Sequence, residues 1–171
     1  KGETTIPGLF AGGTCTDLAY LPGGHLPFCS VTGHWAGETA GAYVAGLRLN
    51  PLVSAQVEQA MNDIVAPLNR PDSVRYGPVH RRLGELVMEK VGLVLRGDRL
   101  QTALDRLLEL REDEVGRLHA ADAHELAKVW GLMHYTRVLE ATLRAYLYRT
   151  ESRVAFIRED YPVIDNANWV K

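Results

Sequence analysis

Residues 100–118 have the sequence LQTALDRLLELREDEVGRL, in which apolar side chains recur every three or four residues. These side chains are Leu100, Leu104, Leu107, Leu108, Val115 and Leu118. The spacing places them on one face of an α-helix and leaves most charged residues on the other faces. The stretch therefore predicts a helix that packs one face into a protein core.

Three further helices are predicted around this stretch. The first covers residues 52–66, and the second covers residues 78–95, with Pro78 in the first turn, where proline is tolerated. The third begins at Asp122 and continues to about Arg149, and its apolar side chains form two neighbouring stripes. The stripes are Leu126, Val129, Trp130 and Met133, and Leu132, Leu139, Leu143 and Leu147. So broad an apolar surface indicates a mostly buried helix in a helical bundle.

The composition is that of an ordinary globular protein and argues against several classes. Nineteen Lys and Arg against 21 Asp and Glu give a net charge of −2, whereas nonspecific binding to nucleic acid needs a basic face. No run of 18 apolar residues is present, so no membrane span is expected. The two cysteines, Cys15 and Cys29, are too few for a disulfide framework or a metal site. We therefore expect reduced thiols, no metal ligands and a cytoplasmic protein.

Residues 1–48 differ from the rest because they hold ten of the 16 glycines. We expect a short strand at residues 9–11, a loop over residues 14–29, and a helix over residues 31–47 capped by Ser30 or Thr32. Three glycines recur along this helix at every fourth residue, at Gly33, Gly37 and Gly41. Such a smooth stripe costs helix propensity, so the helix is expected to pack very close to another backbone or to a flat ligand. Plain packing of the helix on a sheet explains the stripe equally well.

Three stretches of the chain carry a family resemblance. Residues 5–13, TIPGLFAGG, look like the strand and turn that close the FAD-binding domain in the flavoprotein subunits of fumarate reductase, succinate dehydrogenase and adenylylsulfate reductase. Residues 88–92, MEKVG, with Arg96 and the leucines after it, are similar to the first helix pair of that family's C-terminal helical domain. The most specific match is the tail over residues 150–169. It resembles the family at Glu151, Ser152, Arg153, Arg158, Asp160, Tyr161, Pro162, Asp165 and Trp169.

The resemblance implies an α+β chain in three parts. Residues 1–50 would be the C-terminal piece of an FAD-binding α/β domain, residues 51–149 a helical domain, and residues 150–171 an extended tail packed on it. The fingerprint G-x-G-x-x-G, which seats the FAD pyrophosphate, does not occur in the sequence. The flavin pocket would therefore be shared with an N-terminal segment or subunit, and the chain would be inactive without it. The resemblance also implies an iron–sulfur cluster, held only by a partner subunit.

The resemblance also implies which residues face the flavin. Gly12, Gly13 and Thr14 would form the turn beside it. Backbone N–H groups at Cys29, Ser30, Val31 and Thr32 would stabilise charge at the flavin N1 and O2 edge, because a helix N-terminus favours an anion. Gly33, in the first turn of that helix, would let the backbone approach the ring. The alternative is that Ser30 merely caps the helix.

The loop at residues 21–27 departs from the fumarate and succinate enzymes, which carry an arginine there. No arginine lies between Lys1 and Leu47, so a bidentate carboxylate clamp from this loop is excluded and fumarate reduction is disfavoured. An adenylylsulfate-reductase-like or fumarate-reductase-like enzyme with an altered substrate is expected. His25 is the loop's titratable side chain and a candidate catalytic residue, although a lone loop histidine is more often structural.

A second interpretation is a noncatalytic helical scaffold or interaction subunit derived from a flavoprotein. The glycine-rich first 48 residues argue against it, since a scaffold has no reason to keep a flavin-facing helix start. In the tail, Arg153, Arg158 and Asp160 are predicted to form ion pairs that hold the tail on the domain, and Trp169 to anchor the chain end.

Overall fold

The computed structural model describes residues 2–16, 25–48, 51, 53–71 and 74–169. The chain forms two compact units, Lys1–Leu52 and Val53–Lys171. The first unit contains one long helix, α1 (His25–Val44). The second contains α2 (Ser54–Val65), α3 (Tyr76–Leu86), β1 (Val94–Leu95), α4 (Gly97–Asp113), α5 (Ala123–Tyr148), β2 (Ile157–Arg158) and α6 (Asn166–Trp169).

The first unit places a short hairpin against α1. Glu3 and Phe10 form an antiparallel bridge, and the Ala11 N–H donates to the Gly2 carbonyl at 2.8 Å. The strand predicted at residues 9–11 is thus reduced to one bridged residue. The ring of Phe10 packs edge-on against Tyr43 of α1, with centroids 5.7 Å apart.

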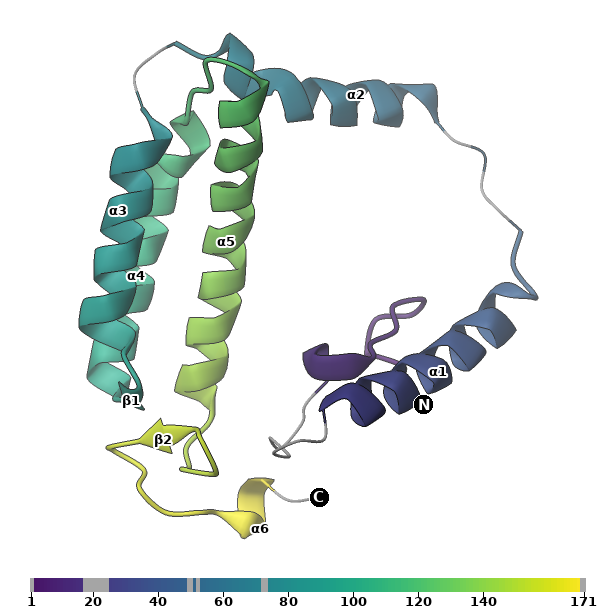
Figure 1. Cartoon of the computed structure of the whole chain (residues 1–171), viewed down its shortest axis with the longest axis vertical. Coiled ribbons are helices and arrows are strands. Elements are labelled where there is room, and N and C mark those ends of the chain that lie inside the picture. The colour runs from purple at the N-terminus through teal and green to yellow at the C-terminus, as the bar shows by residue number, and fades with distance from the viewer. Residues whose placement is uncertain (1, 17–24, 49–50, 52, 72–73, 170–171) are drawn as a thin grey trace. The chain divides into compact units, whose positions relative to one another are not determined.

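The second unit is built on three helices, α3, α4 and α5, which lie side by side (Figure 1). Asp122 caps α5, because its carboxylate accepts the Glu125 N–H at 2.8 Å. The helices bury one continuous apolar core, as the periodicity predicts. It consists of Val79, Leu83, Val91, Leu95, Leu100, Ala103, Leu104, Leu107, Val115, Leu118, Ala120, Val129, Leu132, Leu139 and Leu143.

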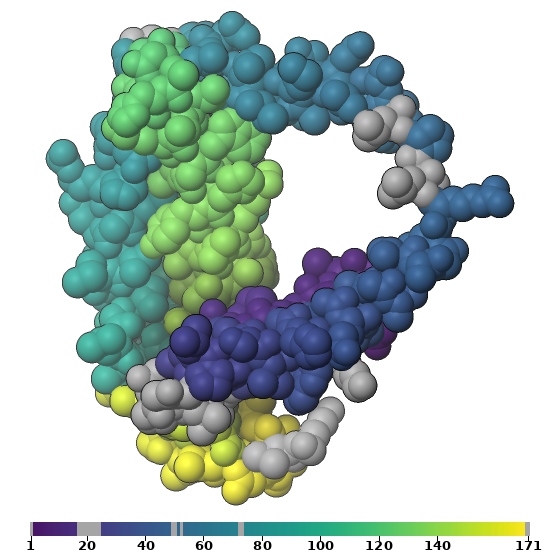
Figure 2. Space-filling view, turned by 45° about the vertical axis from the view of Figure 1, so that its right-hand side comes forward, coloured from purple at the N-terminus to yellow at the C-terminus, as the bar shows by residue number. Residues whose placement is uncertain are grey.

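Helix α2 extends beyond this bundle and buries none of its own residues (Figure 2). Its C-terminal end is attached by Trp130 of α5, whose Nε1 donates to the Ile64 carbonyl at 2.8 Å. The predicted helix at residues 52–66 is confirmed to within two residues.

The predicted helix at residues 78–95 ends early. After α3 the backbone widens into a π-helical turn at Val87–Val91, and Gly92 then adopts φ +63° and turns the chain. Residues 94–95 become β1, which pairs in parallel with β2, Val94 opposite Ile157. The tail therefore joins the second unit through a two-stranded sheet.

The predicted start of α1 is wrong. The helix begins at His25, six residues before the expected Val31, since Pro27 lies in the first turn and does not break it. Ser30 and Thr32 do not cap it: their hydroxyls donate back to the carbonyls of Leu26 and Phe28, at 2.9 and 2.8 Å. The other predicted loop residues, 17–24, lie outside the described part of the chain. None of the described helices is both long and apolar enough to cross a membrane.

Candidate functional site

A glycine turn in the first unit lies directly against α1. Gly13 has φ +75°, a conformation that a side chain would strain, and its N–H donates to Thr32 Oγ1 at 2.8 Å. A Cβ built on Gly12 would lie 3.0 Å from Gly33 Cα and 3.1 Å from its nitrogen. Backbone therefore meets backbone here, and only glycine at position 12 permits the approach.

Cys29 completes this contact. A Cβ at Gly13 would lie 3.3 Å from the Cys29 sulfur, so the thiol fills the space beside the turn. The structure thus brings together five of the predicted site residues, Gly12, Gly13, Cys29, Thr32 and Gly33, although they come from two separate stretches of sequence. Their role towards a cofactor remains a prediction.

The remaining predicted site residues do not join the cluster. Thr14, Ser30 and Val31 are exposed, and His25 is exposed at the first position of α1. Because α1 starts at His25, the N–H groups of residues 29–32 fall within the helical ladder. The predicted role of these four backbone N–H groups towards a flavin stays a prediction. In the described chain, the positive end of the α1 helix dipole lies at His25.

The glycine stripe of α1 faces open space among the described residues. A Cβ built on Gly33, Gly37 or Gly41 would meet no described atom within 4 Å. Helix α1 as a whole contains no buried residue. Within the described chain the stripe is therefore not explained by packing on a sheet.

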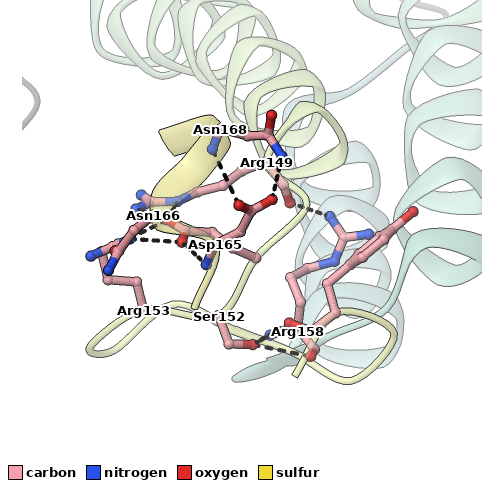
Figure 3. A network of polar contacts seen from close by, with 9 residues as sticks. Arg149, Ser152, Arg153, Arg158, Asp165, Asn166 and Asn168 are labelled. Carbon is pink, nitrogen blue, oxygen red and sulfur yellow. Dashed lines mark hydrogen bonds and ion pairs between the residues drawn. The ribbon is translucent and has the colours of Figure 1, made fainter. Parts of the chain in front are cut away.

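The tail forms a second cluster, centred on a carboxylate that sequence reasoning missed. Glu151 is fully buried, at 0% exposure, and accepts hydrogen bonds from Arg153, from Arg149 and from the Asp165 N–H, each with a contact at 2.9 Å. Figure 3 shows Arg149, Arg153 and Asp165 of this cluster. The Arg153 hydrogen bond is the main cause that lowers the pKa of Glu151 to about 2, and the Asp165 N–H and Arg149 also lower it, against burial. The spacing of Arg149, Glu151 and Arg153 was the signal available in the sequence.

Arg158 connects the tail to two helix ends. Only 2% of this residue is exposed, and Nε and Nη2 donate to the two oxygens of Asp160 at 2.8 and 2.7 Å. Nη1 donates to the carbonyls of Tyr146 and Arg149 at the end of α5. Asp160 in turn accepts the Gly97 N–H at 2.9 Å, at the start of α4.

This pairing makes a structural clamp. The hydrogen bond from Arg158 lowers the pKa of Asp160 to about 2. A cation at a helix C-terminus and an anion at a helix N-terminus are both favourable, so the pair stabilises α4 and α5 together. The predicted Arg158–Asp160 ion pair is confirmed, and Arg153 pairs with Glu151. Trp169 packs edge-on against Tyr148, with ring centroids 5.3 Å apart, which fits the predicted anchoring role.

No group of His, Cys, Asp and Glu among the described residues has the arrangement of a metal site. The two units therefore differ in the kind of site that they contain. The first unit presents a glycine turn and an open small-residue helix face, and the second presents a charged clamp that holds a helical bundle. The turn and the clamp lie in residues 5–13 and 150–169, two of the stretches that carry the predicted resemblance to the C-terminal portion of a flavoprotein subunit.

The comparison with known families agrees. The family model described as fumarate reductase flavoprotein C-term matches residues 80–171, and the chain belongs to this family. The predicted resemblance is confirmed.

Individual proteins extend the match to the whole chain. The Helicobacter pylori fumarate reductase flavoprotein subunit is 28% identical over 99% of this chain and 26% of its own length. A Mycobacterium smegmatis Sdh1 complex in the apo form contains a similar structure, with TM-score 0.79 and 32% identity over 95% of this chain and 29% of that one. Adenylylsulfate reductase from Archaeoglobus fulgidus gives TM-score 0.73 and 26% identity over 85% of this chain and 26% of its own. The chain spans between about a quarter and a third of the length of such relatives.

Proposed function

We propose that this chain is the C-terminal part of an FAD-dependent oxidoreductase, in which it completes a flavin pocket formed mainly by an N-terminal segment or subunit. The observation that carries the proposal is the open space at the glycines of α1, next to the turn at Gly12 and Gly13 that packs against this helix. The sequence has no G-x-G-x-x-G, so the pyrophosphate site must be supplied from elsewhere.

The residues present fit part of an FAD site. A Cβ built on Gly33, Gly37 or Gly41 would meet no described atom within 4 Å, and a flat ring needs such open space. When bound, FAD would supply hydride and electron transfer, and negative charge would gather on one edge of its ring. The N-terminal end of α1, with the positive end of its helix dipole, would stabilise such a charge. His25, at that same position, is the proposed catalytic side chain.

The substrate is proposed to differ from fumarate. No arginine precedes Arg48, so the loop before α1 has no guanidinium that could bind a carboxylate through two parallel hydrogen bonds. We place the chain with adenylylsulfate-reductase-like or fumarate-reductase-like enzymes of altered substrate. Electrons would pass to or from an iron–sulfur subunit.

The test is flavin retention. The chain expressed without its partner should bind FAD weakly or not at all, and expression with the flavin-binding part should give a yellow complex. In that complex, Gly33→Val should weaken FAD binding by roughly 5- to 150-fold, since overpacking costs about 1 to 3 kcal/mol. The chain itself has room for the valine, because a Cβ at position 33 meets no described atom.

Gly116→Val is the matched control, since a Cβ there also meets no described atom. Bound flavin is measured by absorbance after gel filtration. If Gly33→Val retains as much FAD as Gly116→Val, α1 does not face the flavin, and a noncatalytic helical scaffold becomes the better interpretation. Tight, stoichiometric FAD binding by the chain without its partner contradicts the shared pocket.

A further inference from the structure

We propose that a pocket between α3 and α5 binds a small planar anion of the aromatic carboxylate class. The pocket has a volume of about 290 Å³ and is lined by Tyr76, His80, Lys128, Gly131, Leu132 and Tyr135. Both helices belong to the second unit, so the pocket lies within one unit. Ligand pockets hold roughly 300 to 1,000 Å³, and this one is therefore sized for a small molecule.

Aromatic rings form the walls of this pocket. Tyr76 and His80, one turn apart on α3, stack with centroids 5.1 Å apart and planes 20° from parallel. Tyr135 adds a third ring from α5. Flat walls of this kind favour a flat ligand, because aromatic faces stack on one another with an offset.

Gly131 keeps the pocket open. It lies in the middle of α5, where glycine weakens a helix, and a Cβ there would meet no described atom within 4 Å. Close packing within the described chain therefore does not explain the glycine. The space that it leaves belongs to the pocket, beside the buried side chain of Leu132.

The charge of the lining selects an anion. Lys128 carries the permanent charge among the six lining residues, and none of the six is acidic. The two tyrosine hydroxyls and the His80 ring add hydrogen-bonding groups. A carboxylate attached to an aromatic ring would satisfy both features, with its ring against the walls and its charge at Lys128.

The probe is benzoate, with benzamide as its neutral analogue, titrated into the ¹⁵N-labelled chain and followed by amide chemical shifts. We expect saturable shifts in α3 and α5 with benzoate and at least fivefold weaker binding of benzamide. Lys128→Met should weaken benzoate binding at least fivefold, and Gly131→Leu should abolish it by filling the pocket. Lys90→Met and Gly116→Leu are the matched controls and should bind as the parent does.

Three outcomes would overturn the proposal. They are an absence of saturable binding at millimolar benzoate, equal binding of benzoate and benzamide, and unchanged binding by Gly131→Leu. If Gly131→Leu fails to fold, the benzamide comparison and Lys128→Met still decide the matter.

Discussion

Replacing Arg158 by methionine tests the clamp at the end of the bundle. Methionine keeps an apolar stem of similar length but removes every donor. The substitution strips Asp160 of two hydrogen bonds and leaves the carbonyls of Tyr146 and Arg149 without this donor. Arg158 is 2% exposed but the side chain of Asp160 is 32% exposed, so the charge that remains in the variant can be hydrated. The expected cost is therefore that of a lost hydrogen bond to a charged group, about 1.5 to 3 kcal/mol.

The assay is urea unfolding of the chain followed by circular dichroism. With a slope of about 2 kcal/mol per molar urea, the Arg158→Met midpoint should fall by roughly 0.8 to 1.5 M. Arg144→Met is the control, because Arg144 forms an exposed pair with Glu140, four residues earlier on α5. Such pairs contribute about 0.3 to 0.5 kcal/mol, so the control midpoint should hardly move.

A double substitution sharpens the result. Asp160→Ala alone leaves the buried Arg158 guanidinium without its carboxylate, so both single variants should be costly. The double variant should then lose less than the sum of the two losses, with a coupling of about 0.5 to 3 kcal/mol. If Arg158→Met unfolds at the same urea concentration as Arg144→Met, the clamp does not stabilise the bundle and the argument fails.

Two further predictions concern the same region. The fold lowers the pKa values of Glu151 and Asp160 from 4.5 and 3.8 to about 2. Their charged forms therefore stabilise the fold fully at a pH above those ordinary pKa values, and this stabilisation is lost as the pH falls towards 2. The urea midpoint should therefore fall between pH 5 and pH 2, and it should fall less in Glu151→Gln; parallel pH curves for parent and variant would contradict this. Gly97→Ala should lower the urea midpoint at a cost of about 1 to 3 kcal/mol, because its Cβ would lie 2.8 Å from Asp160 Oδ2, and Arg158 and the Gly97 N–H hold that oxygen in place. Gly84→Ala in α3, where a Cβ meets no described atom, should instead raise it by about 0.4 to 1 kcal/mol, and a shift of the same sign in both variants would refute the steric reason.

The helical bundle could be predicted because its signals are local. The leucine spacing fixes α4, and Asp122 before an apolar run marks the start of α5. The end of α3 could not be found in this way. The π-helical turn at Val87–Val91 keeps nearly helical side-chain spacing, although its backbone hydrogen bonds span five residues instead of four. Strands β1 and β2 have two residues each, which is too short for any alternating pattern.

Two errors at the candidate site have a shared physical origin. Ser30 and Thr32 were interpreted by their commonest role, as caps, and the loop predicted over residues 14–29 included Pro27. A proline in the first turn is compatible with a helix, and Ser or Thr hydroxyls inside a helix can donate to carbonyls of the preceding turn. The residue types were therefore compatible with a start of α1 either at His25 or near Val31. The contact of Gly12 with Gly33 joins two distant positions of the chain, so no periodic pattern in the sequence could predict it.

The clamp also has a consequence for how the protein is made. A ribosome synthesises Gly97 63 residues before Asp160, so α4 and α5 emerge while the groups that cap their ends do not yet exist. The nascent bundle reaches its full stability only after Arg158 and Asp160 have been synthesised. A message cut short between α5 and β2 would yield a chain with every core leucine of the bundle but no clamp, and such a chain is a natural target for cellular proteases.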